Sequence, residues 1–198
     1  MKKLVWCLIG SILLVSSCAT QGPVLVRKPY GPFYVGNLYG GYISYGEGRH
    51  AGIDFDLSIG TPIIAASDGE VVYLAVALPD EKYSGGIGVA LGHGDRIGSF
   101  YGHLTKVFIE EGQLVKRGQL IGLSGASNSG YRHLHFGIYK RGELAHLYSK
   151  SYDPDEFWTD GEPKCFNPAT DYSKYSQEKI TLPVACGEYA NELISKIK

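Results

Sequence analysis

The sequence lacks an excess of charge of either sign. Its 198 residues include 19 lysine and arginine side chains against 20 aspartate and glutamate side chains, a formal net charge of −1. A protein that binds nucleic acid through its phosphates carries a strongly basic patch, and an acidic tail would shift the balance the other way. We therefore expect no nucleic-acid partner.

Long apolar runs are also missing, apart from one at the N-terminus. Residues 4–15, LVWCLIGSILLV, follow the basic residues MKK. The run is shorter than the about 20 residues that a membrane-spanning helix needs, so it predicts a secretory signal peptide over residues 1–17. The following residues, VSSCAT, resemble a bacterial lipobox, in which Cys18 is lipidated and begins the mature chain. An ordinary signal peptide that is cut nearby is the alternative.

Cysteine is scarce, with four residues in the chain. Cys7 lies inside the signal peptide and Cys18 in the lipobox, which leaves Cys165 and Cys186. No C-x-x-C spacing indicates a cysteine zinc site. In an exported protein we expect Cys165 and Cys186 to form a disulfide, and two free thiols are the alternative.

Helical patterns are absent until late in the chain, whereas the 27 glycines separate short runs of alternating apolar residues. This predicts an antiparallel all-β fold, either a two-sheet sandwich or a flattened barrel. We expect a lipidated tether and lead-in at 18–40, the β domain at 41–145, and an irregular extension at 146–198 that ends in a short helix. The extension is interpreted as a brace on the outside of the domain, with a flap over the site as the alternative.

Two histidines occur one residue apart in YRHLHFGIY. On a strand, His133 and His135 point to one face, above an apolar face that holds Leu134 and Phe136. They can be metal ligands, an acid/base pair, one of each, or unrelated surface residues. His93, in LGHGD, is interpreted as a turn residue, and His146 as an exposed one.

Other segments bring further metal-binding residue types. In HAGIDFDL, His50 and Asp54 share one face of a strand, and SFYGHL adds His103. Two imidazoles and one carboxylate, with a fourth position open, are typical of a catalytic zinc site. The remaining histidines would then act on water or on the substrate.

Four stretches in this order resemble the lysostaphin/LytM-type zinc metallopeptidases that cut peptidoglycan: RHAGIDFDLSIGTPIIAASDGEVV, SFYGHL, VKRGQLIGLSGASNSG and HLHF. The resemblance covers residues 49–139. It implies a fold of the duplicated hybrid motif type. It also implies one Zn²⁺ ion held by His50, Asp54 and His135, with His103 and His133 as the catalytic histidines.

The function that the resemblance implies is a zinc-dependent peptidoglycan hydrolase, and we expect a D,D-endopeptidase. Its partners would be peptidoglycan stem peptides and, through the lipid on Cys18, a membrane; a monomer is expected. Ala19 after Cys18 resembles the outer-membrane sorting pattern, which would face the protein to the periplasm in a Gram-negative cell. Because some family members lack these residues and only activate other hydrolases, a non-catalytic cell-wall lipoprotein is the alternative.

A lipoyl-type or efflux-adaptor domain is a further alternative, because DGEVV followed by GQLVKRGQLIG is also their hairpin pattern. Those domains lack the ordered histidines, which argues against it.

Three features need structural information. Gly137 stands where many relatives have an acidic residue, and residues 77–86 look like a longer loop that lines the substrate groove. Asn37 is either an occluding ligand or a loop residue.

Overall fold

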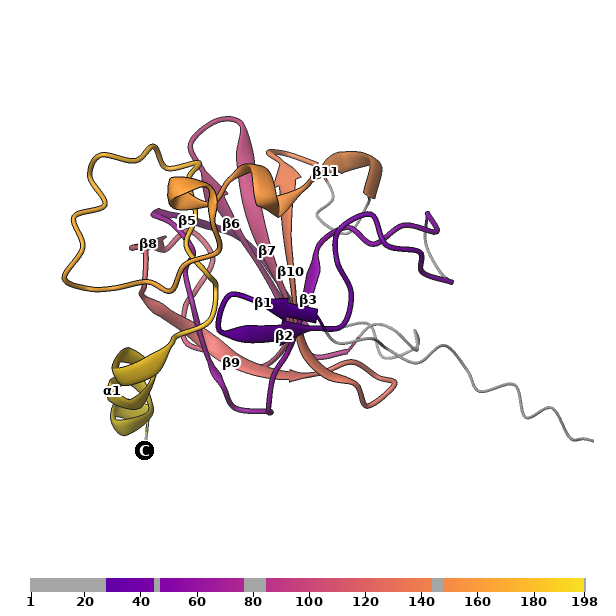
Figure 1. Ribbon diagram of the computed structural model, residues 1–198, viewed down its shortest axis with the longest axis horizontal. Coiled ribbons are helices and arrows are strands. Elements are labelled where there is room, and N and C mark those ends of the chain that lie inside the picture. The colour runs from indigo at the N-terminus through magenta and orange to yellow at the C-terminus, as the bar shows by residue number, and fades with distance from the viewer. Residues whose placement is uncertain (1–27, 45–46, 77–84, 144–147, 198) are drawn as a thin grey trace, which may run out of the picture.

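The structure is a computed structural model that describes residues 28–44, 47–76, 85–143 and 148–197. The predicted signal peptide, Cys18, His146 and most of the predicted long loop lie outside the described residues. Within the described ranges, no helix combines the length and apolarity needed to cross a membrane. Figure 1 shows a body built from strands, with the helix α1 (Gly187–Ile197) at one end.

In the part of the chain that the structure describes, eleven strands belong to one antiparallel sheet, whose main path runs β1-β2-β3-β10-β9-β7-β6-β5-β8. In chain order they are β1 (Lys28–Tyr30), β2 (Phe33–Val35), β3 (Ile53–Asp56), β4 (Pro62–Ile64), β5 (Gly69–Val76), β6 (Ile87–His93), β7 (Ile97–Val107), β8 (Leu114–Val115), β9 (Leu120–Ala126), β10 (Arg132–Lys140) and β11 (Ser151–Tyr152). Among the described residues of the C-terminal extension, 3-10 turns lie at Tyr148–Lys150, Pro154–Glu156 and Thr159–Gly161.

The predicted antiparallel all-β fold with a short terminal helix is confirmed, but its strands form one continuous sheet instead of two. The reason is the length of β7, which pairs with β10 over its first part and with β9 over its second. The change of partner falls at His103, because Gly102 is the last residue of β7 that pairs with β10 and Leu104 is the first that pairs with β9. Backbone hydrogen bonds therefore continue around the corner at which two sheets would otherwise separate.

Strand β10 positions the predicted site residues. It pairs with β3 on one edge and with β7 and β9 on the other. His135 is the cross-strand partner of both Asp54 and Gly102, while His133 is the partner of Asp56. Directly opposed residues on an antiparallel pair have Cβ atoms about 5 Å apart, so this register alone brings the candidate ligands together.

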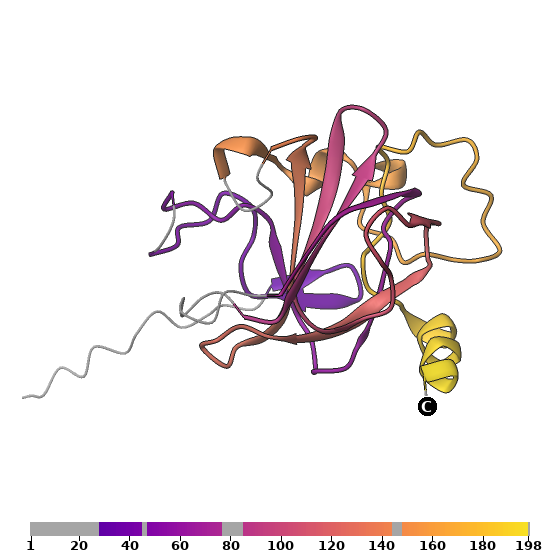
Figure 2. The same cartoon turned by 180° about the vertical axis from the view of Figure 1, so that it is seen from behind.

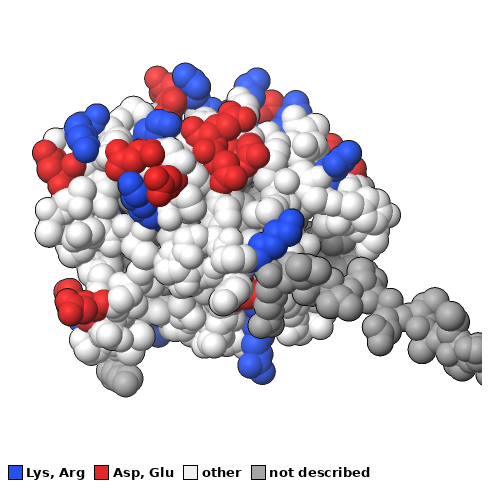
Figure 3. All heavy atoms as spheres, in the orientation of Figure 1, with Lys and Arg blue, Asp and Glu red and all other residues white. Residues whose placement is uncertain are grey.

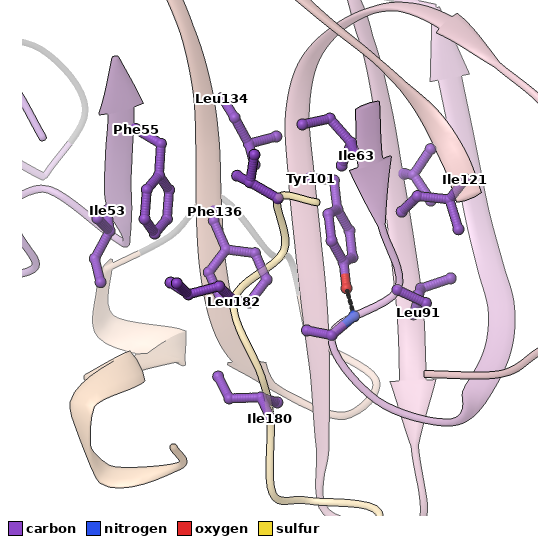
Figure 4. Packing of buried hydrophobic residues seen from close by; sticks show 14 of the residues in the cluster. Ile53, Phe55, Ile63, Leu91, Tyr101, Ile121, Leu134, Phe136, Ile180 and Leu182 are labelled. Atoms are coloured by element: carbon purple, nitrogen blue, oxygen red, sulfur yellow. Dashed lines mark hydrogen bonds between the residues drawn. The ribbon is translucent and has the colours of Figure 1, made fainter. Parts of the chain in front are cut away.

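The C-terminal extension completes the hydrophobic core. Ile180, Leu182 and Val184 are fully buried, and Figure 4 shows Ile180 and Leu182 among side chains of the sheet strands. Trp158, also in the extension, is 1% exposed and stacks on Phe136 of β10. The interpretation of the extension as an external brace is therefore wrong, because its alternating apolar residues cover the open face of the sheet.

A partly buried arginine fastens the extension to the sheet. The Arg117 guanidinium donates hydrogen bonds to the carbonyl of Ala66, at 2.7 Å, and to that of Lys179, at 2.6 Å.

His93, interpreted from sequence as a turn residue, is fully buried at the end of β6, with its ring nitrogens 2.7 Å from the Asp68 carbonyl and the Ser99 hydroxyl. Burial lowers the pKa of His93 to about 4, so the ring is neutral at physiological pH.

The structure joins Cys165 and Cys186, which are separated by 21 residues in sequence, in a disulfide. Closing a loop of this length stabilises the fold by about 3 kcal/mol in the chain-entropy treatment. The bridge lies just before α1, which packs through Leu193 near Ile64 of β4. Figure 2, which views the molecule from behind, shows α1 beyond the end of the sheet.

The segment before β3 is part of the same sheet. Strands β1 and β2 form a hairpin, and Val35 pairs with Phe55 of β3. The chain then passes along the candidate ligands, with backbone hydrogen bonds from Asp54 to the Asn37 carbonyl and from His50 to the Gly41 carbonyl. The described part of the predicted lead-in therefore forms one wall of the site.

On the face drawn in Figure 3, acidic and basic side chains are interspersed, and a broad lower area carries little charge.

Candidate metal centre and catalytic histidines

Three candidate ligand atoms form a nearly equilateral triangle. Nε2 of His50, Oδ1 of Asp54 and Nδ1 of His135 lie 3.0 Å from one another. His50 comes just before β3, Asp54 lies within β3, and His135 is in β10. The structure thus brings together the three residues that the resemblance implies as metal ligands.

This triangle fits a tetrahedral zinc ion. Ligand distances of about 2.0–2.1 Å place neighbouring ligand atoms of a tetrahedron about 3.3 Å apart, close to the observed separations. Two imidazole nitrogens and one carboxylate oxygen are also ligand types that zinc accepts. The second ring nitrogen of His50, Nδ1, donates to the Leu38 carbonyl at 3.2 Å. That contact directs Nε2 into the triangle, as expected for a metal-binding histidine whose other ring nitrogen is hydrogen-bonded to the protein.

Electrostatics keep Asp54 ionised. Burial by itself would raise the pKa of Asp54, but its contacts with His50 and His135 outweigh burial and hold that pKa well below its usual range. Burial would lower the pKa of His50, yet the Asp54 carboxylate raises it. For His135, burial prevails over the hydrogen bond to Asp54, and its pKa is lowered. A deprotonated carboxylate and a neutral imidazole are the forms that bind a metal ion, so the pKa shifts of Asp54 and His135 favour binding and the raised pKa of His50 opposes it.

The two predicted catalytic histidines lie together beside this triangle. The ring centroids of His103 and His133 are 4.4 Å apart, and Nε2 of His133 is 3.7 Å from Oδ1 of Asp54. His103 Nδ1 donates to the Gly85 carbonyl at 2.9 Å, and His133 Nδ1 donates to the Tyr131 carbonyl at 3.0 Å. Each imidazole in its neutral form therefore has Nε2 as a proton acceptor.

His103 is held in an unusual backbone conformation. Its φ is 63°, in the left-handed region that non-glycine residues seldom adopt. Burial, together with the neighbouring His133 and His135, lowers the pKa of His103 to about 4. The residue is therefore neutral and able to accept a proton at physiological pH.

Asn37 contacts the site directly. Its side-chain amide donates to Oδ2 of Asp54 at 2.7 Å, so the carboxylate presents its other oxygen to the histidines. Asn37 is therefore more than a loop residue, because its side chain is hydrogen-bonded to a candidate ligand. The observed contact orients a candidate ligand, as the outer-shell partners of metal ligands commonly do.

Gly137 has a packing role at this site. A Cβ added to it would lie 2.9 Å from the Ala51 carbonyl oxygen and 3.8 Å from Nε2 of His135. The position thus faces the site, as strand alternation predicts. Here the backbone next to His50 approaches β10 too closely for a side chain.

We expect Gly137→Ala to lower the free energy of unfolding by about 1–3 kcal/mol, because the added methyl group forces the backbone around Ala51 away from β10. Lys140→Ala, at the exposed end of the same strand, is the matched control and should change stability by less than about 0.5 kcal/mol. Urea unfolding of both variants provides the measurement. Equal stabilities for Gly137→Ala and the unsubstituted protein would show that the close approach is unimportant.

Sequence reasoning missed Tyr131 and Asp56. The Tyr131 ring stacks on His133, with centroids 4.3 Å apart, and its hydroxyl donates to the Asp56 carboxylate. The signal was present in the alternation, because Tyr131 stands two positions before His133 and therefore on the same face.

Comparison with known proteins agrees with this geometry. A family model described as Peptidase family M23 matches residues 48–147. Glycyl-glycine endopeptidase ALE-1 of Staphylococcus capitis is 37% identical over 113 residues, 56% of this chain and 28% of the relative. Peptidoglycan DD-endopeptidase ShyA of Vibrio cholerae is 41% identical over 96 residues, 47% of this chain and 21% of the relative. The chain thus spans about a quarter of the length of these relatives.

A solved structure shares the fold. The catalytic domain of the antimicrobial peptidase lysostaphin from Staphylococcus simulans is similar with a TM-score of 0.54 and 34% identity, over 62% of this chain and 89% of that domain. The family model covers half of the chain and includes all five candidate site residues. The chain therefore belongs to peptidase family M23.

Proposed function

We propose that this chain is a zinc-dependent peptidoglycan hydrolase that cleaves peptide cross-links of the bacterial cell wall. The observation that carries the proposal is the triangle of His50, Asp54 and His135, with His103 and His133 beside it. The names of the relatives support the substrate class, because ALE-1 and ShyA are both endopeptidases and ShyA is a peptidoglycan enzyme.

The residues would divide the work as follows. His50, Asp54 and His135 would hold one Zn²⁺ ion, which when bound lowers the pKa of a water molecule towards about 7 and polarises a peptide carbonyl. His103 and His133 both present Nε2 as an acceptor. One of them takes the proton of the attacking water, and the resulting imidazolium can donate to the oxyanion or to the leaving amine.

For the bond that is cleaved, we propose the cross-link between D-alanine and diaminopimelate. The similarity to ShyA, a DD-endopeptidase, supports this choice, as does the lipobox-like sequence around Cys18. The similarity to ALE-1, a glycyl-glycine endopeptidase, makes a glycine bridge the competing substrate.

Digestion of two kinds of purified cell wall separates these substrates. We expect Gram-negative sacculi to yield monomeric muropeptides at the expense of cross-linked dimers, and pentaglycine-bridged walls to remain intact. The opposite pattern would exclude a D,D-endopeptidase. Release of stem peptides free of glycan would instead identify an amidase.

For its location, we propose that a lipid on Cys18 anchors the protein to a membrane, at the outer membrane facing the periplasm in a Gram-negative host. Cys18 lies outside the described residues, so the support is its lipobox-like sequence. Incorporation of labelled palmitate into the full chain, and its loss in Cys18→Ala, is the expected result. Equal labelling of both proteins would contradict the anchor.

A non-catalytic activator is the second candidate. Its support is the similarity to a Lipoprotein NlpD/LppB homolog of Pseudomonas aeruginosa, which is 36% identical over 110 residues. The assembled ligand triangle favours the enzyme instead. The two functions differ in one result, because an activator would leave sacculi intact unless a second hydrolase were added.

A further inference from the structure

We propose that Tyr131 is a positioning residue that fixes the imidazole of His133 for proton transfer, an inference that rests on the proposed hydrolase function. Tyr131 reaches His133 with both its side chain and its backbone. It lies outside the metal triangle and outside the set of five residues that the family resemblance implies.

Two contacts define where the His133 ring lies. The Tyr131 ring stacks on it at a centroid distance of 4.3 Å and an interplanar angle of 23°. The Tyr131 carbonyl accepts the Nδ1 proton of His133 at 3.0 Å. Stacking fixes the plane of the imidazole, while the hydrogen bond fixes its rotation within that plane and its tautomer. Together they point Nε2 of His133 towards the metal triangle, where it lies 3.7 Å from Oδ1 of Asp54.

Tyr131 is itself held at its far end. Its hydroxyl donates to Oδ1 of Asp56, the residue that lies opposite His133 in the pairing of β3 with β10. A Cβ added to Gly36 would collide with this hydroxyl, so the absence of a side chain at Gly36 leaves room for the end of the Tyr131 side chain. Tyr131 is thus clamped between the N-terminal wall of the site and β10.

These contacts restrict the orientation of the His133 imidazole. Because the His133 ring lies 4.3 Å from the Tyr131 ring and 4.4 Å from the His103 ring, between centroids, it cannot rotate freely. Misplacement of a catalytic group by about 1 Å can reduce a rate about 100-fold, so a residue with this role affects turnover more than substrate binding.

The experiment compares Tyr131→Leu with Tyr131→Phe in the full chain, using purified sacculi as the substrate. We expect Tyr131→Leu to lower kcat about 10- to 100-fold, with KM within about twofold and zinc content unchanged. Tyr131→Phe keeps the stacked ring and should stay within about fivefold of the unsubstituted protein. Tyr73→Leu, at a half-exposed tyrosine of β5, is the matched control and should have no effect.

A double-mutant cycle distinguishes positioning from general support. If Tyr131 acts through His133, adding Tyr131→Leu to His133→Ala costs nothing further in kcat. The proposal is overturned by an unchanged kcat in Tyr131→Leu, by loss of zinc as the cause of the decrease, or by the same decrease in the His133→Ala background.

An NMR measurement that does not depend on catalytic activity separates this proposal from the proposed function. The ring current of Tyr131 should shift the carbon-bound protons of His133 upfield in the NMR spectrum, and Tyr131→Leu should remove that shift. If Tyr131→Leu fails to fold, Gly36→Ala, which displaces the tyrosine, should reduce the shift instead. An unchanged shift overturns the positioning role, whereas inactive protein with the shift present overturns only the hydrolase function.

Discussion

Replacing His135 with alanine is expected to abolish stoichiometric zinc binding, whereas replacing His133 with alanine should leave the zinc in place and lower turnover about 100- to 1000-fold. The reason is the difference in their contacts. Nδ1 of His135 is one of the three atoms of the triangle, at 3.0 Å from both His50 and Asp54. His133 instead directs Nδ1 to the Tyr131 carbonyl and lies beside His103.

The two variants control for each other, because both replace a histidine of β10 with the same residue, two positions apart. Metal analysis of the dialysed proteins, followed by sacculus digestion with zinc in excess, gives both quantities. If His135→Ala retains as much zinc as the unsubstituted protein, the ligand assignment is wrong. If His133→Ala digests sacculi at the normal rate, the catalytic assignment is wrong.

Replacing Trp158 with alanine is expected to lower the free energy of unfolding by about 3–5 kcal/mol, the usual cost of deleting a large buried aromatic side chain. Trp158, in the extension, is 1% exposed and stacks on Phe136 of β10, the strand that carries His133 and His135. Its Nε1 donates to the Asp155 carboxylate at 2.8 Å and to the Tyr30 hydroxyl at 2.9 Å. One residue thus joins the extension, the sheet and the N-terminal hairpin.

Urea unfolding measures this effect, with Tyr73→Ala, a half-exposed aromatic residue of β5, as the control. The control should change stability by about 0.5 kcal/mol or less. A loss below about 1 kcal/mol for Trp158→Ala would mean that the extension contributes little to the core, and that the β domain is stable without it.

The all-β class was predictable because alternation is a local pattern. In HAGIDFDL and YRHLHFGIY, each apolar residue marks the buried face, and the structure buries Ile53, Phe55, Leu134 and Phe136 accordingly. The single sheet was not predictable in the same way. Which strands share a partner depends on the length and bend of β7, and these are fixed by pairing between segments far apart in sequence.

The geometry of the candidate site was predictable in part. Strand alternation places His133 with His135 before any partner strand is known, whereas His50 lies before β3, so its position beside Asp54 depends on the loop and not on the strand expected over residues 50–57. Alternation cannot predict the residues that orient the candidate site. Leu38 and Gly85 accept hydrogen bonds from the histidines through their backbone carbonyls, and Asn37 donates one from a loop. The pattern around His93, LGHGD, indicates a turn residue, and this interpretation is wrong because the ring is buried in contact with Asp68 and Ser99.

The C-terminal extension differs most from what its sequence pattern predicts. Its proline-punctuated composition indicates irregular structure, and most of it is irregular. Irregular backbone can still supply a core, however, since Ile180, Leu182 and Val184 alternate and are all fully buried. This arrangement fixes the apolar side of β10, and thereby the side that carries the histidines.

The most direct test of the account is the release of soluble fragments from purified sacculi by the full chain, before chelation, after chelation, and after zinc is added back. We expect release to stop when the metal is removed and to return with stoichiometric zinc, because the proposed function requires an ion held by His50, Asp54 and His135. Release that continues unchanged after complete metal removal, or no release by the zinc-loaded protein, would contradict a zinc-dependent peptidoglycan hydrolase.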